Sequence, residues 1–167
     1  MNRLRAFGPT LLCFALILAQ ALWYWNRIPE HVTSHAGLNG EAVGSRSKEM
    51  FFAFEALLVF LTTGLFSLIA SRLPQVKPEL FNIPNKQYWL APKRTQETIE
   101  FIQRRLRFMG TVAGLFTVLI SQLVLDTNLS GHPLSQTTIV ELVAGFAVVI
   151  AGFSISMAIR FSRVPKT

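Results

Sequence analysis

The sequence predicts an all-α fold: an integral membrane four-helix bundle with an ordered outer loop and a cytoplasmic amphipathic helix. Of the 167 residues, 51% are hydrophobic and only 15% are charged. A soluble domain has about a quarter of its residues charged and spreads them along the chain. Here the charges separate long apolar runs, so lipid is the expected solvent.

Four apolar runs are long enough to cross a bilayer, which takes about 20 residues of helix. They cover residues 7–25, 50–71, 108–125 and 138–161. The first run ends on Trp23, Tyr24 and Trp25, an aromatic belt typical of the membrane interface. We therefore expect a single membrane domain, with an outer loop over residues 26–49 and a cytoplasmic loop over residues 72–107.

The basic residues predict the orientation. Thirteen of the 16 Lys and Arg residues lie before the first run, in loop 72–107 or from Arg160 near the end of the last run onward, and three lie in loop 26–49. Because cytoplasmic segments carry the excess of Lys and Arg, both termini should be cytoplasmic. This distribution also accounts for the net charge of +7, so we expect the lipid bilayer and no nucleic acid as a partner.

A secretory signal peptide is the alternative for the first run. Arg3 and Arg5, the apolar residues 11–18 and the small residues Ala19 and Ala21 fit its three regions. Cleavage would leave three spans in the same orientation. The apolar run continues past the candidate cleavage site to the aromatic belt, which favours an uncleaved span.

Helical spacing and small residues indicate how the spans pack. Ile99, Ile102 and Leu106 recur at helical spacing, which predicts the amphipathic helix over residues 95–107. Gly110 and Gly114 form a GxxxG pattern in the third run, where two backbones can approach closely. Further small residues occur in the fourth run: Ala147, Ala151, Gly152 and Ser156. A packed bundle and a homo-oligomer both fit this pattern.

Two loop segments on either side of the second run carry a resemblance to a known family. The first reads IPEHVTSH over residues 28–35 and is followed by Gly40, Gly44, Ser47 and Lys48; the second reads NIPNKQYWLAPKR over residues 82–94. These segments resemble the bacterial membrane family called domain of unknown function 1648, which is related to SdpI-type immunity proteins. The resemblance implies a multi-pass protein of the bacterial cytoplasmic (inner) membrane and no known catalytic activity.

The same segments supply the residues expected to contact a partner or ligand: His35, Gly40, Gly44 and Lys48 outside, and Tyr88 and Trp89 inside. The two aromatic rings are amphipathic, so we expect them to anchor the cytoplasmic loop against the membrane or the bundle.

A metal or proton site on the outer side is a second expectation. His31 and His35 would share one face of a helix, and Glu55 and Glu141 lie toward the outer ends of their spans. Imidazole and carboxylate suit a divalent metal such as zinc, and ionisable groups inside a membrane mark functional sites by default. The competing interpretation makes the histidines ordinary loop residues and lets neighbouring polar groups satisfy Glu55.

The first functional hypothesis is a non-enzymatic protein that acts by interaction, in an immunity, sensing or complex-scaffolding role. It would bind a peptide or membrane protein through the outer loop, or hold a complex together within the bilayer. The alternative is a small transporter or metal-dependent membrane enzyme that uses His35, Glu55 and Glu141. The sequence contains no Ser-His-Asp set, phosphate loop or CxxC motif, which favours the first hypothesis, for which no cofactor is expected.

Overall fold

The computed structural model describes residues 3–33, 44–132 and 135–164. Within these residues, four helical segments are long and apolar enough to cross a membrane, which confirms the all-α prediction. They are Phe7–Tyr24, Lys48–Gln75, Thr95–Ser130 and Gln136–Ser162. Each coincides with one of the four apolar runs, so the chain is a multi-pass membrane protein.

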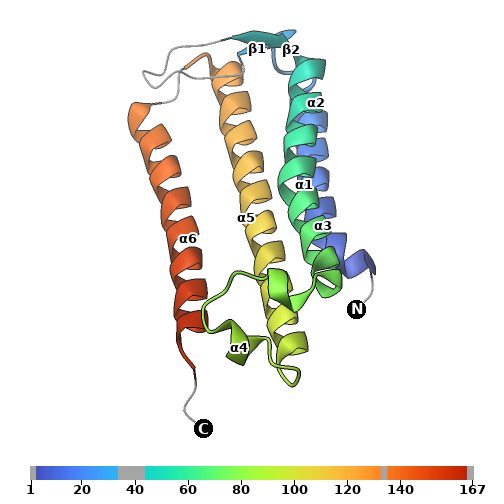
Figure 1. Cartoon of the computed structure of the whole chain (residues 1–167). Coiled ribbons are helices and arrows are strands. Elements are labelled where there is room, and N and C mark those ends of the chain that lie inside the picture. The colour runs from blue at the N-terminus through green and yellow to red at the C-terminus, as the bar shows by residue number, and fades with distance from the viewer. Residues whose placement is uncertain (1–2, 34–43, 133–134, 165–167) are drawn as a thin grey trace.

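The helices run side by side along one axis (Figure 1). In chain order the elements are α1 (Arg3–Tyr24), β1 (His31–Thr33), β2 (Ser45–Ser47), α2 (Lys48–Val59), the π-helical η1 (Phe60–Gly64), α3 (Leu65–Arg72), the 3-10 turns η2 (Leu73–Gln75) and η3 (Pro78–Leu80), α4 (Lys86–Trp89), α5 (Thr95–Ser130) and α6 (Gln136–Ser162). The antiparallel strands β1 and β2 lie at one end, the ribbon end, and α4 lies at the other, the α4 end.

The predicted amphipathic helix and the predicted third span form one continuous helix, α5, of 36 residues. At 1.5 Å per residue α5 is about 54 Å long, well beyond the bilayer core of about 30 Å. Its surplus length therefore projects past the membrane at the α4 end. At the ribbon end α5 finishes at Gly131, whose φ of 71° is the left-handed conformation that glycine adopts at helix C-termini.

Helices α1, α2–α3 and α5 form a three-helix core that contains two buried apolar clusters. The cluster nearer the ribbon end consists of Tyr24, Ile28, Val32, Phe51, Phe52 and Leu125. The second cluster, further toward the α4 end, consists of Cys13, Ile17 and Val59. Each cluster draws on more than one of the helices, so burial joins all three along their length.

The two glycines of the GxxxG pattern are where α5 approaches the second span most closely. A Cβ atom on Gly114 would lie 2.2 Å from Cγ2 of Thr63 and 3.0 Å from Sγ of Cys13. A Cβ atom on Gly110 would lie 2.7 Å from Cβ of Phe66. The pattern thus mediates packing within the chain, and only glycine fits at these two positions.

The second span is not a uniform α-helix, because residues 60–64 widen into the π-helical turn η1. The Thr63 hydroxyl donates to the Val59 carbonyl at 2.6 Å, and the Thr62 hydroxyl donates to the Leu58 carbonyl at 2.7 Å. Hydroxyl bonds to the preceding turn compete with the regular ladder and bend helices. The widened turn lies at the level where Gly110 and Gly114 meet the second span.

Helix α6 stands apart from the core. None of its most apolar 18-residue stretch is buried, whereas 28% to 33% of the corresponding stretches in the other spans is. Phe146 of α6 stacks on Phe116 of α5, with ring centroids 4.2 Å apart. At the α4 end, Phe161 packs against Trp89 of α4. Among the described residues, α6 is therefore held mainly at its last turn and at one mid-helix stack.

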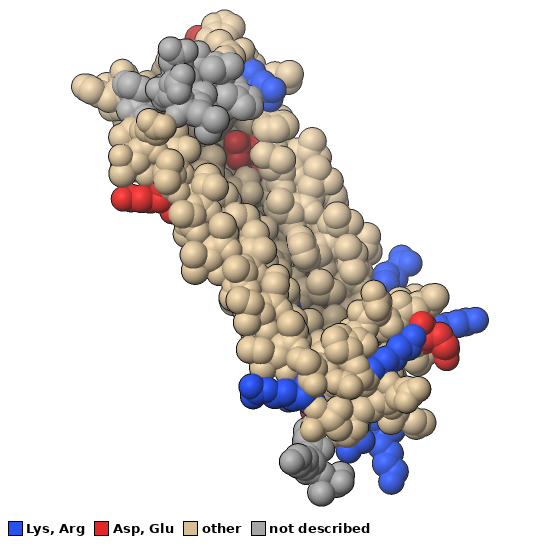
Figure 2. Space-filling model, turned by 60° about the vertical axis from the view of Figure 1, so that its left-hand side comes forward, with Lys and Arg blue, Asp and Glu red and all other residues tan. Residues whose placement is uncertain are grey.

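Charged side chains gather toward the two ends of the molecule. Figure 2 shows most Lys and Arg at one end, and between the ends a long band with almost no charge. Such an apolar band, bounded by charged ends, is what a protein embedded in lipid presents.

Candidate functional site

The gap between α5 and α6 contains an elongated groove with a volume of about 540 Å³. Its walls are two rows of side chains: Val112, Leu115, Phe116, Leu119 and Leu123 from α5, and Thr138, Glu141, Leu142, Gly145, Phe146 and Val149 from α6. The α5 row runs over the twelve residues from Val112 to Leu123, or about 16 Å of helix. The groove is thus long, narrow and parallel to the helices.

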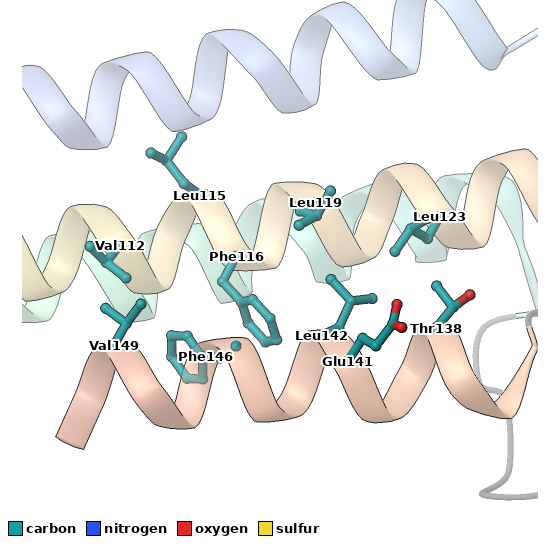
Figure 3. A pocket seen from close by; sticks show the side chains of 11 residues that line it. Val112, Leu115, Phe116, Leu119, Leu123, Thr138, Glu141, Leu142, Phe146 and Val149 are labelled. Atoms are coloured by element: carbon teal, nitrogen blue, oxygen red, sulfur yellow. The ribbon is translucent and has the colours of Figure 1, made fainter. Parts of the chain in front are cut away.

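The polar groups of this groove lie at its ribbon end. Glu141 and Thr138 point into the space between α6 and α5, and apolar side chains line the rest (Figure 3). Glu141 makes no hydrogen bond or ion pair with any residue that the structure describes. A carboxylate on an apolar wall is costly inside a membrane unless a donor or a cation meets it. Glu141 therefore makes the groove a candidate binding site.

A second groove of about 600 Å³ lies between α1 and α5. It shares Leu115 and Leu119 with the first, so these two side chains separate the two spaces. Its polar lining consists of Gln20, Tyr24 and Gln122.

These polar groups form a chain of hydrogen bonds from α1 to α5. The Gln20 amide donates to the Val118 carbonyl at 3.1 Å and to Oε1 of Gln122 at 3.0 Å. The Gln122 amide donates to the Tyr24 hydroxyl at 2.6 Å, and that hydroxyl donates to Asp126. Side chains that bond across helices hold membrane bundles together. This series of hydrogen bonds therefore joins α1 to α5, and it includes no residue of α6.

Lys48 is built into the ribbon end. Its ammonium group lies 2.8 Å from a carboxylate oxygen of Glu30 and 5.0 Å from the centre of the Trp25 ring, and the residue is buried. Its backbone N–H donates to the Glu30 carbonyl at 3.1 Å. Lys48, predicted to contact a partner, is thus engaged in fixing the start of α2. Gly44 adopts a positive φ of 81° just before β2.

The predicted cytoplasmic aromatic residues lie in α4, and Trp89 contacts the last turn of α6. Nε1 of Trp89 donates to the Phe161 carbonyl at 3.1 Å, and the Asn85 amide donates to the carbonyls of Phe161 and Ser162 at 2.9 and 3.0 Å. These carbonyls end α6 and have no partner within the helix. Tyr88 packs edge-on against Trp89. The NIPNKQYWLAPKR segment is therefore a cap on the last turn of α6.

The four residues predicted to bind a metal do not all fall within the described part of the chain. His35 lies outside it, as does Gly40 of the predicted partner site. His31 is exposed on β1, Glu55 is buried in the core, and Glu141 lines the α5–α6 groove. No three His, Cys, Asp or Glu residues gather into a metal-binding group among the residues described. The zinc site centred on His35 stays a prediction.

Sequence reasoning did not identify the hydrogen-bonded chain on α1 and α5. Its signal was present, because Gln20 and Gln122 are uncharged polar residues inside otherwise apolar runs. Polar residues within spans tend to face other helices. What the sequence could not supply was the pairing, which depends on how α1 and α5 are rotated against each other.

Comparisons with known proteins bear on the part of the chain that builds the ribbon end. Neither the curated proteins nor the solved structures contain a match to this chain. Residues 11–61, from α1 to the start of η1, match the model of the family described as a domain of unknown function, DUF1648, which confirms the predicted resemblance over that segment.

Proposed function

We propose that the protein works by interaction within the bilayer, by taking one helix of a partner membrane protein into the groove between α5 and α6. The observation that carries this proposal is the Glu141 carboxylate, which pairs with no residue that the structure describes, on a groove wall that is apolar apart from it and Thr138. A non-enzymatic role of this kind develops the first hypothesis from the sequence. It moves the expected contact surface from the outer loop to the membrane interior.

The shape of the groove supports a helical occupant. The groove runs parallel to α5 and α6 between two rows of mostly apolar side chains, so it can take the side chains of a third helix. Gly145 lines this wall, and a Cβ atom placed there would have no neighbouring atom within 4 Å. Small residues at such positions let two helix backbones approach closely in lipid.

Charge complementarity specifies the occupant further. Glu141 is the sixth residue of α6, so it lies about 7 Å along the helix from the ribbon end. A Lys or Arg side chain at that depth in the partner would pair with the carboxylate. The first, third and fourth spans of this chain have no Lys or Arg between residues 6 and 26 or between residues 108 and 159. At the ribbon end of the second span the basic residue is Lys48, which Glu30 already holds. A second copy in parallel orientation therefore offers no free basic residue at this depth.

The orientation in the membrane belongs to the same proposal. Most Lys and Arg residues lie in the segments at the α4 end, which supports a cytoplasmic α4 end and cytoplasmic termini in a bacterial inner membrane. The groove would then receive its partner in the outer half of the bilayer.

Photocrosslinking in intact membranes tests the proposal. A benzophenone amino acid in place of Leu142, which lines the groove, should give one discrete protein adduct. The same group in place of Val143, which is exposed but does not line the groove, should give none. The crosslinked peptide should carry Lys or Arg near the outer end of a transmembrane helix.

Two further variants make the result specific to the groove. Gly145→Leu fills the wall and should abolish the adduct, whereas Gly152→Leu, at an equally open glycine off the groove, should leave it unchanged. Glu141→Gln should reduce the adduct about fivefold, the effect of about 1 kcal/mol of polar contact in lipid. Phospholipid adducts alone, an adduct to a second copy of the chain, or equal adducts at both benzophenone positions would overturn the proposal.

A further inference from the structure

The interior of the three-helix core contains a layer of polar side chains between the two apolar clusters. Gln20 of α1, Glu55 of α2 and Ser121 of α5 are 9%, 7% and 0% exposed. Each contributes one buried oxygen that has no hydrogen-bond partner in the described part of the chain: Oε1 of Gln20, Oε2 of Glu55 and Oγ of Ser121. Three helices thus present an unsatisfied oxygen inside one bundle.

Their neighbours along each helix place these oxygens at one level. On α2, Glu55 lies between Phe51 of the ribbon-end cluster and Val59 of the second cluster. On α1, Gln20 lies between Ile17 and Tyr24, which belong to the same two clusters. Ser121 on α5 lies one turn from Leu125 of the ribbon-end cluster, and one turn on its other side Val118 packs against the second.

The existing hydrogen bonds of the polar layer show which donors and charges it is missing. The Gln20 amide nitrogen already donates to α5, so its free oxygen can only accept. An ionised Glu55 also only accepts, and it has no ion pair with a described residue. A buried charge without a partner is among the most unfavourable states a protein group can adopt. The layer is therefore short of donors and of one positive charge.

The charged and titratable groups on the packed elements do not supply that charge. Lys48, two turns toward the ribbon end on α2, is already held by Glu30. The other titratable groups near the layer are not cations: Tyr24 on α1 and Asp126 on α5 toward the ribbon end, and Cys13 on α1 toward the α4 end. The arginines of these elements lie at the α4 end, at least 14 residues or about 21 Å along their helices from the layer: Arg3, Arg5, Arg72, Arg104, Arg105 and Arg107.

We propose that the polar layer is a binding site for one small monovalent cation, Na⁺ or a proton carried on Glu55, which the oxygens of Gln20 and Ser121 help to hold. A carboxylate, an amide and a hydroxyl oxygen are hard ligands suited to such a cation. Calcium takes six to eight oxygens and usually more than one carboxylate, which this layer does not offer. The site is separate from the α5–α6 groove and does not depend on the partner proposed there.

The test uses the full chain in lipid nanodiscs, with choline replacing Na⁺ at constant ionic strength. If Na⁺ is the cation, it should raise the unfolding temperature of the wild type by about 5 °C at saturation. Glu55→Gln, which has the same shape without the charge, should lose this dependence. Ser121→Ala should keep the fold and raise the Na⁺ concentration needed for half of the shift about fivefold. Glu141→Gln, at a carboxylate outside the layer, is the matched control and should respond as the wild type does.

If a proton is the cation, unfolding should not depend on Na⁺. The infrared spectrum at neutral pH should instead contain a protonated carboxyl band that is absent from Glu55→Gln and present in Glu141→Gln. An ionised Glu55 carboxylate together with an unfolding temperature independent of Na⁺ would overturn the proposal, as would an equal Na⁺ response of wild type and Glu55→Gln.

Discussion

The three-helix core and helix α6 are both apolar and both span the membrane, yet they are held by different contacts. In the core, glycines allow close backbone approach and glutamines bond between helices. Among the described residues, helix α6 meets α5 through the Phe116–Phe146 stack in mid-membrane and, at the α4 end, through Phe161 on Phe101 and Arg160 beside Glu97. The cap built by Asn85 and Trp89 also holds that end. Because lipid gives no hydrophobic drive for two helices to associate, α6 is held only where these specific contacts exist. On the ribbon-end side of the aromatic stack, no ring contact, ion pair or hydrogen bond joins α6 to the core among the described residues, and this part of α6 is where we expect a partner to bind.

The largest expected effect comes from adding a side chain where the core is closest. Gly114→Leu forces carbon atoms into the space of Thr63 and Cys13, so we expect a loss of about 3 kcal/mol in the free energy of unfolding. Gly152→Leu on α6 meets open space and should stay within about 0.5 kcal/mol of the wild type. Unfolding of both variants in mixed micelles measures the difference. Equal losses would mean that α6 packs as tightly as the core.

The cap on α6 is the next largest contribution. Trp89→Ala removes the ring that packs on Phe161 and the hydrogen bond to its carbonyl, so we expect a loss of about 2–3 kcal/mol. Trp89→Phe keeps the aromatic contact and should lose only about 1 kcal/mol. Amide exchange of the last turn of α6 should rise in Trp89→Ala while that of α1 stays unchanged. A rise spread over all four helices would contradict a cap specific to α6.

Much of this comparison was readable from the sequence. The four apolar runs gave the spans, since about 20 apolar residues have few alternatives to a membrane helix. Gly110 and Gly114 predicted close packing, and the structure places that contact inside the chain. The strand pair was not predicted, because His31–Thr33 and Ser45–Ser47 are three residues each and too short for periodicity to reveal.

The sites were less predictable than the spans. Glu55 and Glu141 were expected near one metal, and this stays a prediction; the structure places Glu55 in the core and Glu141 on the wall of the α5–α6 groove. The direction in which each carboxylate points depends on the rotation of its helix about its axis, and an almost uniformly apolar run such as α6 leaves that rotation undetermined. The same uncertainty hid the unsatisfied oxygens of Gln20 and Ser121.

A smaller effect is expected where the ribbon joins the core. The Asn128 side chain accepts from the Thr33 N–H at 2.8 Å and donates to the Thr33 carbonyl at 3.1 Å, as a neighbouring strand would. Asn128→Leu leaves both backbone groups unpaired and should cost about 1–2 kcal/mol. The Thr33 amide should then exchange faster with solvent, while the last turn of α6 stays as protected as before. Unchanged exchange at Thr33 would show that the ribbon is held by other contacts.

The smallest effect is expected at the Lys48–Glu30 pair. The Glu30 side chain is 76% exposed, although that of Lys48 is only 11% exposed. Because water and salt screen a carboxylate that stays in solvent, such a pair contributes at most about 1 kcal/mol. Glu30→Gln should therefore change the free energy of unfolding by less than about 0.5 kcal/mol. Thermal unfolding at low and high salt measures this. A salt-sensitive loss above about 1 kcal/mol would show that the pair matters more than its exposure indicates.

The most direct test of the account is whether a basic helix enters the space between α5 and α6. Spin labels at Leu129 and Val140 would report the α5–α6 distance at the ribbon end, and labels at Leu22 and Leu129 the α1–α5 distance, with the buried Cys13 replaced by Ala. In nanodiscs, a synthetic Leu/Ala transmembrane peptide with one Lys near its outer end should shift and narrow the first distance and leave the second unchanged. The same peptide with Leu in place of that Lys should act at least about fivefold more weakly. No shift with the Lys peptide, or equal shifts with both peptides, would contradict the account.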